Sequence, residues 1–267
     1  MALIKLLSVD MDGTLLNSNL EISAKNLYAL KKLLDKNIKI IFATGRTFKA
    51  ANYYAKIHNL DVYIICYNGA FIQKSNSNNV LYCSKIDKDI AKDILIKAEK
   101  INVYTKVYVN DILYIQDDNE EARNFSKNNR ITYKCVGKLS DFINEDPNMI
   151  VFIDTSEKIN KISEIVKSKF KYSVTNTSSE PDSLELVPYG NSKRNSLEFL
   201  CKKLNINSDE VISIGNGIND LEMLKWSKIG VAVKNSDPKL LKEYKLVSKH
   251  TNNEDAIFYI LKEYKII

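Results

Sequence analysis

The sequence predicts an α/β protein built on a parallel sheet, with a second domain of the α+β class inserted into it. Short apolar segments alternate with helical patterns near both ends of the chain, as in parallel strands joined by helices. Between them, apolar and polar residues alternate within paired strands, which is typical of a sheet with one solvated face. The predicted domains are a discontinuous first domain, residues 1–82 and 187–267, and an inserted domain, residues 83–186.

The N-terminal part predicts three strands joined by two helices. Residues 3–9 are short, mostly apolar and followed by a glycine turn, as a buried strand is. A helix is expected after Ser23, a suitable N-cap, because leucines then recur at helical spacing. A strand over 38–43, a helix over 49–58 and a strand over 62–66 follow. Right-handed units of this kind build a parallel sheet.

The rest of the chain predicts the inserted domain and then a return to the α/β pattern. In the inserted domain, Asn110-Asp111 is expected to join the strands of a hairpin, 103–109 and 112–116. Its other elements are expected to be helices near 90–101, 120–127 and 159–166, and strands near 132–136, 149–153, 172–175 and 184–187. The α/β pattern resumes with a helix from Ser192-Lys193, a strand over 211–214, a helix from 221, a strand over 229–233, a helix begun by Asp237-Pro238 and a last helix over 254–262.

Composition argues against several classes of function. The formal net charge is +6, but the lysines are spread among acidic residues, so a solvated surface is expected rather than a nucleic-acid interface. The four cysteines show no paired spacing and the chain has two histidines, which favours reduced thiols over a zinc site. No signal-peptide pattern or membrane-length apolar run is present. We therefore expect a cytoplasmic protein with no membrane or nucleic-acid partner.

Polar side chains follow several of the predicted strands. Asp10 and Asp12 come directly after the first strand, and their spacing in extended chain points both to the same side. Taken alone, the pair also fits ordinary turn residues. Two like charges so close repel each other, and either a divalent cation or a shared proton would remove the conflict.

The carboxyl ends of parallel strands share one edge of the sheet, so we expect polar clusters from distant segments to meet there. Besides the two early acids, this edge would receive Thr44, Gly45, Arg46, Asn216, Asn219 and Asp220, with Lys193 from the first turn of a helix. Carboxylates, a hydroxyl and a lysine suit the binding of a phosphoryl group together with Mg²⁺.

These motifs, in this order, resemble those of the haloacid dehalogenase (HAD) superfamily. They are Asp10-x-Asp12-Gly-Thr-Leu-Leu, Ala-Thr44-Gly-Arg, Tyr-Asn68-Gly-Ala, Ser-Lys193 and Gly-Asn216-x-x-Asn219-Asp220. The likeness covers essentially the whole chain and is strongest to the Cof-type phosphatases, which carry a large cap before the lysine motif. It implies a Rossmann-like HAD core with an inserted α+β cap of the C2B type. It also implies a phosphoric monoester hydrolase that uses Mg²⁺ and acts on small phosphomonoesters such as sugar phosphates.

The resemblance also implies roles for the matching residues. Asp10 would attack phosphorus and form an aspartyl-phosphate, while Asp12 would protonate the leaving alkoxide and then deprotonate water. Thr44 and Lys193 would bind phosphate oxygens. Metal binding would involve the Asp10 carboxylate, the Asp12 backbone carbonyl, Asn216, Asn219 and Asp220, the last two at the metal or in its second shell. Gly45, Arg46 and Asn68 would line the substrate entrance.

One position departs from the family pattern. The family usually has a metal-binding aspartate where this chain has Asn216, and an asparagine oxygen can bind Mg²⁺ but brings no charge. Metal affinity should therefore be lower, although Asp220 could compensate. The alternative function is accordingly a protein that binds a phosphorylated metabolite with little or no turnover.

Other interpretations are weaker. Arg46 fits a surface ion pair as well as a substrate contact. The motif Gly215-Asn-Gly217 lacks the third glycine of a dinucleotide-binding loop and has Asp220 there instead. A mutase could use the same two early acids, whereas a dehalogenase has no need of Asp12 to protonate its leaving group. The sequence makes no prediction of the oligomeric state.

Overall fold

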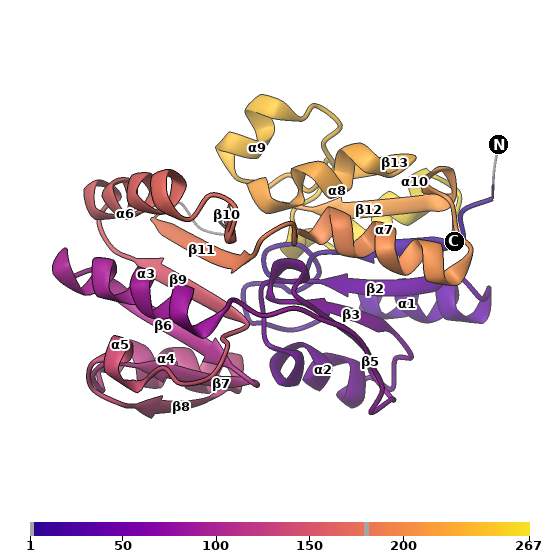
Figure 1. Ribbon diagram of the computed structural model, residues 1–267. Helices are drawn as coiled ribbons and strands as arrows, with labels where there is room; N and C mark the ends of the chain where they lie inside the picture. The colour runs from indigo at the N-terminus through magenta and orange to yellow at the C-terminus, as the bar shows by residue number, and fades with distance from the viewer. Residues whose placement is uncertain (1–2, 179–181) are drawn as a thin grey trace.

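The computed structural model describes residues 3–178 and 182–267, and the chain forms two units, each built on its own sheet (Figure 1). The first sheet has seven strands in the order β13-β12-β1-β2-β3-β4-β5. From β13 to β3 the neighbouring strands are parallel, and β4 and β5 add an antiparallel edge. These strands are Ile229–Ala232, Val211–Gly215, Leu6–Val9, Lys39–Ala43, Tyr63–Cys66, Phe71–Lys74 and Val80–Cys83. The predicted parallel α/β core is confirmed.

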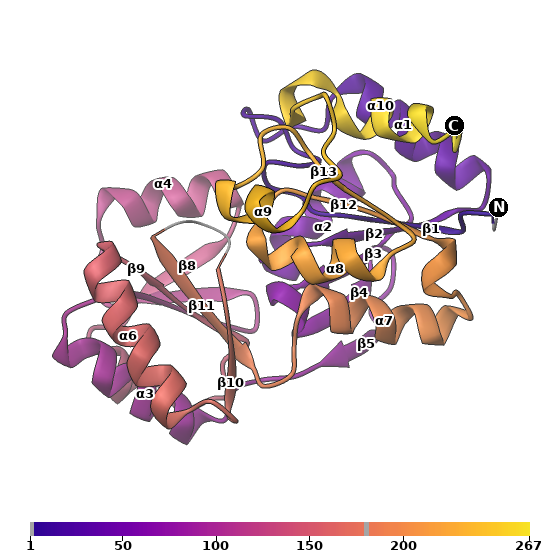
Figure 2. The same ribbon diagram turned by 90° about the horizontal axis from the view of Figure 1, so that it is seen from above.

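Helices cover both faces of this first sheet (Figure 2). One face packs against α1, α2 and α10, and the other against α7 and α8. These helices are Ala24–Asp35, Phe48–Ile57, Ala256–Glu263, Lys193–Leu204 and Leu221–Trp226. Strand β1 shows why the strands are mostly apolar, since both faces are covered: Leu7 and Val9 pack in the hydrophobic cluster with α1, α2 and α10, and Leu6 packs in the cluster with α7 and α8.

Local sequence signals explain where several helices begin. The Ser23 side chain accepts a hydrogen bond from the backbone N–H of Asn26 and caps α1, as predicted. Asp237 caps α9, Pro238–Glu243, with the proline in the first turn. Short 3₁₀ turns complete the unit: η1 Tyr67–Gly69, η2 Ser208–Glu210, η3 Ile218–Asp220 and η4 Asn252–Glu254.

The second sheet has six strands in the order β10-β11-β9-β6-β7-β8, antiparallel except for the pair β7–β8. These strands are Val174–Thr177, Ser183–Pro188, Met149–Ile153, Tyr104–Val109, Ile112–Ile115 and Thr132–Cys135. Helices α3, Lys88–Lys100, and α6, Ser156–Lys169, pack on one face. The unit also holds α4, Glu120–Asn129, and α5, Leu139–Phe142. The hairpin joined by Asn110-Asp111 is as predicted.

The prediction that one face of this second sheet is solvated is wrong. Tyr108, Met149 and Val151 lie on the face opposite α3 and α6, and they join the hydrophobic cluster of the first unit. Lys106 on the same face is also buried. This face is therefore covered by the first unit and by α4, and its alternating polar residues point into the space between the two units.

Two further findings concern the limits of the two units. The edge hairpin β4–β5 was not expected, because its strands are short and separated by a polar loop, residues 75–79. The second sheet extends to Pro188, while the predicted domain limits at residues 83 and 186 stay a prediction. No helix within the described residues is both long and apolar enough to cross a bilayer.

Candidate active site

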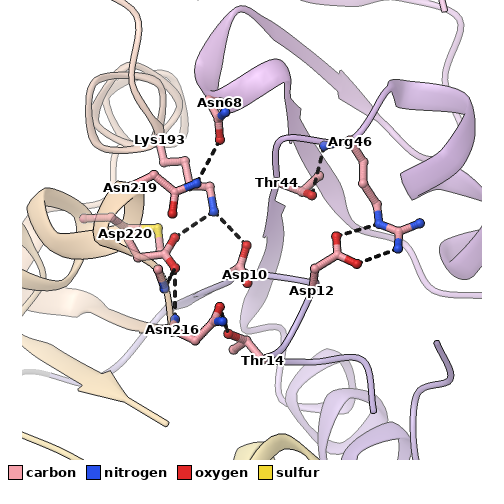
Figure 3. Close-up of polar contacts among 12 residues, drawn as sticks. Asp10, Asp12, Thr14, Thr44, Arg46, Asn68, Lys193, Asn216, Asn219 and Asp220 are labelled. Atoms are coloured by element: carbon pink, nitrogen blue, oxygen red, sulfur yellow. Dashed lines mark hydrogen bonds and ion pairs between the residues drawn. The ribbon is translucent and has the colours of Figure 1, made fainter. Parts of the chain in front are cut away.

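A cavity of about 590 Å³ lies between the carboxyl edge of the first sheet and the buried face of the second. Its floor is formed by the loops that follow β1, β2 and β12, together with the start of α7. Figure 3 shows the polar side chains that these segments bring together. The size suits a small-molecule ligand.

A buried lysine binds two carboxylates at the centre of this floor. Lys193 Nζ lies 2.7 Å from Asp10 Oδ1 and 2.7 Å from Asp220 Oδ1. The second oxygen of Asp220 accepts hydrogen bonds from the backbone N–H groups of Asn216, at 2.9 Å, and Gly217, at 3.0 Å. Both oxygens of Asp220 thus hold the lysine and the loop after β12.

The ionisation of this cluster follows from its burial. Burial raises the pKa of Asp10 to about 7, against the opposing effect of Lys193. Burial would lower the pKa of Lys193, but the adjacent charges of Asp10 and Asp220 outweigh it, and the lysine pKa is raised. The lysine therefore stays a cation, and it favours the ionised form of Asp10.

The second early acid forms an ion pair on the other side of the floor. Arg46 Nε donates to Asp12 Oδ2 at 2.7 Å and Nη2 donates to Asp12 Oδ1 at 2.5 Å. The arginine side chain is 6% exposed, whereas that of Asp12 is 50% exposed. Burial would lower the pKa of Arg46, but its bonds to Asp12 raise it. No described residue accepts a hydrogen bond from the buried Nη1 of Arg46.

Arg46 therefore pairs with an acid of the site itself. The sequence had left open a surface ion pair or a substrate contact for this residue. The Asp12 carboxylate points to Arg46, while that of Asp10 points to Lys193, so the two acids diverge (Figure 3).

The remaining predicted residues line the same floor. Thr44 Oγ1 accepts a hydrogen bond from the Arg46 backbone N–H at 3.1 Å, which leaves its O–H to act as a donor. Asn68 Oδ1 accepts from Asn219 Nδ2 at 3.1 Å, and Asn68 Nδ2 donates to Glu185 of the second sheet. A Cβ at Gly45 would lie 3.3 Å from the Asn68 side chain, so the glycine allows this close contact.

The Asn216 side chain meets a group of oxygen atoms. One terminal atom of its amide lies 2.9 Å from Asp10 Oδ2, 3.0 Å from the Asp12 carbonyl oxygen and 2.9 Å from Thr14 Oγ1. When that atom is the nitrogen, it donates to all three neighbours. Gly13 makes the approach possible, because it has a φ of +74° and a Cβ there would lie 2.6 Å from this amide.

With the amide turned the other way, the same atoms form a set of Mg²⁺ ligands. An octahedral ion with bonds of 2.0–2.1 Å separates adjacent ligands by about 2.9 Å, close to the 2.9 Å and 3.0 Å that separate this Asn216 atom from Asp10 Oδ2 and from the Asp12 carbonyl oxygen. Within residues 3–178 and 182–267, no three Asp, Glu, His or Cys side chains converge as a metal site. A cation here would therefore depend on carbonyl and amide oxygens as well as on Asp10, and the donor set fits Mg²⁺.

The sequence did not predict the roof of the cavity. Glu185 on β11, Val151 on β9 and Lys106 on β6 stand in register across the second sheet and line the cavity. Lys106 Nζ also lies 3.9 Å from the centre of the Phe125 ring. A lysine and a glutamate within mostly apolar strands were the available signal. The prediction of a solvated face for this sheet places them in solvent instead.

The first unit is a parallel α/β sheet with a buried acid–lysine pair at its carboxyl edge, and the second unit covers that edge. The chain matches the family model of the haloacid dehalogenase-like hydrolases over residues 7–261. It therefore belongs to this family and is a phosphoric monoester hydrolase, which confirms the resemblance found in the motifs.

Individual proteins support the same assignment. The chain is 25% identical to the 5-amino-6-(5-phospho-D-ribitylamino)uracil phosphatase YitU of Bacillus subtilis over 264 residues, 97% of each chain. It is 31% identical to TM0651 of Thermotoga maritima, whose crystal structure superposes with a TM-score of 0.82 over 98% of this chain and 97% of that one. A haloacid dehalogenase-like hydrolase from B. subtilis shares the fold at 24% identity, with a TM-score of 0.88 over 97% of this chain and 99% of the other.

Proposed function

We propose that the protein is a Mg²⁺-dependent phosphatase that hydrolyses small phosphomonoesters through an aspartyl-phosphate on Asp10. The observation that carries this proposal is the buried Asp10 carboxylate held 2.7 Å from Lys193 at the floor of a cavity. Residues 83–186 would act as the cap that covers this cavity and excludes water from it.

In the first half of the proposed reaction, the Asp10 carboxylate attacks phosphorus and the bond from phosphorus to the leaving oxygen breaks. Asp12 would enter this step protonated and give its proton to that oxygen, so the product leaves as an alcohol. The carboxylate that results is the form that Arg46 binds through both oxygens in this structure. In the second half, Asp12 takes a proton from water, which attacks phosphorus and releases phosphate and Asp10. Lys193 and the Thr44 hydroxyl donate to the phosphoryl oxygens.

Asp10, the Asp12 carbonyl and the Asn216 oxygen would hold Mg²⁺, with Asp220 and Asn219 supporting the loop behind them. The ion supplies positive charge that offsets the negative charge of the phosphoryl group. Asp220 fixes the backbone of Asn216 and Asn219 binds Asn68, so both act through their neighbours.

We propose small phosphorylated metabolites, such as sugar phosphates, as substrates. The cavity has polar groups on both sides, with Arg46 on the floor and Lys106 and Glu185 on the roof. The apolar Val151 of β9 lies between Lys106 and Glu185 in the second sheet. Hydroxyl groups of a sugar or sugar alcohol can both donate to a carboxylate and accept from a cation. The related YitU is named for a substrate with a phosphorylated ribityl chain, which supports this class.

Release of inorganic phosphate from a panel of phosphorylated metabolites, with and without Mg²⁺, tests the proposal. We expect turnover with Mg²⁺, loss of turnover in EDTA and recovery when Mg²⁺ is restored. Equal rates with and without EDTA would contradict the metal dependence, and transfer of phosphate to another hydroxyl would identify a mutase.

Asn216→Asp should lower the Mg²⁺ concentration that gives half-maximal activity by roughly 10-fold, because a carboxylate adds a charge among the ligands. Phosphate release measured against Mg²⁺ concentration checks this. Asn160→Asp, on the exposed face of α6, adds the same charge far from the site and should leave the curve unchanged.

The same pair of proteins tests the alternative function, a non-enzymatic binder of phosphorylated metabolites that Asn216 suggests. In that case the unmodified chain would be stabilised by phosphorylated ligands without turnover, and Asn216→Asp would create activity. Brisk turnover by the unmodified chain would eliminate the alternative.

Arg46→Lys should lower kcat by roughly 10-fold with a smaller change in KM, because one ammonium cannot hold both oxygens of Asp12 and the acid–base group loses its position. Steady-state kinetics of phosphate release gives both constants. Arg194→Lys, at an ion pair on the surface of α7, is the matched control. A change in KM alone would instead identify Arg46 as a substrate contact.

A further inference from the structure

The tip of the β6–β7 hairpin in the second unit binds the first unit through one side chain, that of Asp111. Its Oδ1 accepts from the backbone N–H of Phe48 at 2.9 Å and from the Tyr67 hydroxyl at 2.5 Å, and its Oδ2 accepts from the Lys49 N–H at 3.1 Å. Figure 1 shows this end of the hairpin beside α2. One carboxylate thus binds three donors that come from two separate segments of the first unit.

The chemistry of the contact is favourable on the side of α2. Phe48 and Lys49 lie in the first turn of this helix, where backbone N–H groups have no partner within the helix. A negative charge at this end is also favoured by the helix dipole. The contact therefore pairs the negative charge of Asp111 with backbone N–H donors at the start of α2.

The hairpin presents Asp111 in a defined position. Asn110 has a φ of +50° and Asp111 a φ of +63°, as expected for the central residues of a two-residue hairpin turn. The Asn110 backbone N–H donates to Asn148 Oδ1 at 2.9 Å within the same unit. The turn is thus anchored in the second unit, and only the Asp111 side chain crosses to the first.

The receiving segment in the first unit is strained and adjoins the active site. Tyr67 and Asn68 both have a left-handed backbone, with φ of +48° and +50°, which is unfavourable for a residue with a side chain. The Tyr67 N–H donates to the Arg46 carbonyl at 3.1 Å and the Asn68 N–H to the Thr44 carbonyl at 3.0 Å. Their side chains reach the second unit at two points, Asp111 and Glu185.

Strand β6 connects this contact to the roof of the cavity. Lys106 and Tyr108 line the cavity from β6, and that strand leads directly into the turn that carries Asp111. The Tyr108 ring also lies 6.3 Å from the Tyr67 ring, between centres. A shift of the hairpin tip would therefore move the roof residues relative to the floor.

We infer that Asp111 is a positioning residue for the reaction, one that holds the β6 part of the roof over Asp10 by binding the start of α2 and the Tyr67 hydroxyl. It touches no reacting group, and it acts through Lys106 and Tyr108, which face the leaving group. The expected effect on catalysis rests on the proposed function, whereas the contact of Asp111 with the first unit can be tested without measuring activity.

Asp111→Gly is the variant of choice. Glycine adopts a positive φ readily, and Asn-Gly is a favoured pair for a two-residue hairpin turn, so the hairpin is kept while the contact is lost. Asn110→Gly is the matched control, because it changes the same turn and leaves Asp111 in place. Both are made in the full-length chain.

The first measurement is amide hydrogen exchange in the peptide that covers the start of α2. We expect exchange there to be roughly 10-fold faster in Asp111→Gly than in the unmodified protein or Asn110→Gly, because two backbone N–H groups lose their acceptor. Unchanged exchange would overturn the inference.

The second measurement is kcat/KM for two probes, glucose 6-phosphate and acetyl phosphate. We expect the larger glucose group to contact the roof and the acetyl group not to do so, and on this basis Asp111→Gly should lower the value for glucose 6-phosphate by roughly 10-fold and that for acetyl phosphate by less than about 3-fold. Equal losses for both probes, or none, would show a merely structural role and overturn the inference. An unmodified protein that hydrolyses neither probe would instead contradict the proposed function.

Discussion

Asp10→Asn should reduce phosphate release by roughly 10³-fold or more, because an amide cannot replace the carboxylate nucleophile. The variant should remain folded, because Lys193 still has the Asp220 carboxylate as an ion-pair partner at 2.7 Å. The carboxylate that is removed is also one whose charged form is already disfavoured by burial. We expect the free energy of unfolding to change by no more than about 1 kcal/mol. Phosphate release and urea unfolding, measured on the same preparation, check both statements.

Asp93→Asn is the matched control for this variant. Asp93 lies on the exposed side of α3, so the same chemical change there should leave both activity and stability unaltered. Retention of more than about a tenth of the activity by Asp10→Asn would show that another group attacks phosphorus.

Lys193→Met should remove activity to a similar extent and also destabilise the protein by about 3–5 kcal/mol. The methionine fills the space of the buried lysine stem but leaves Asp10 and Asp220 close together without their cation. Lys193 is the group that opposes the rise in the pKa of Asp10, so its loss raises that pKa further and leaves the nucleophile protonated at neutral pH.

The destabilisation of Lys193→Met should depend on pH in a defined direction. The pKa of Asp10 is about 7 in the folded protein, above its ordinary value of 3.8, so the folded state binds the proton more tightly. The corresponding stability is present at low pH and is lost as the pH rises through the folded pKa. In the unmodified protein this loss is largely complete near pH 7, whereas in the variant, whose Asp10 pKa is raised further, it continues above pH 7. The destabilisation by Lys193→Met should therefore be larger at pH 8 than at pH 5, as measured by urea unfolding in EDTA.

Lys202→Met in the same helix is the control, since Lys202 is 74% exposed and pairs only with Glu198 on the surface. Its unfolding free energy should change by less than about 0.5 kcal/mol at either pH. If Lys193→Met matched this control, the buried cluster would contribute nothing to stability and the assigned charges would be wrong.

Most of the fold was predictable because the pattern of apolar residues reports burial. Strand β1 is mostly apolar because both of its faces are covered, and the caps Ser23 and Asp237 stand where their helices begin. The β4–β5 edge hairpin escaped prediction, because edge strands have fewer neighbours to impose a pattern.

The site was predictable as a set of residues, and its pairings were not. The sequence placed Asp220 at the metal or in its second shell, which stays a prediction, and it did not predict that the Asp220 oxygens bind Lys193 and two loop amides. A buried ammonium needs such acceptors on more than one side. The Arg46–Asp12 pair depends on where two loops meet, and the burial of Lys106 and Glu185 depends on how the two sheets face each other. A single sequence holds no direct signal for these distances, and the roles of the site residues stay predictions until the variants are measured.

The contact between Asp10 and Lys193 joins positions 183 residues apart, with the whole second sheet encoded between them. During synthesis on the ribosome, the nucleophile emerges long before the lysine that keeps it ionised. A nascent chain that stops within the second unit therefore lacks that partner, and catalytic competence arises only once the late segments have closed onto the early ones.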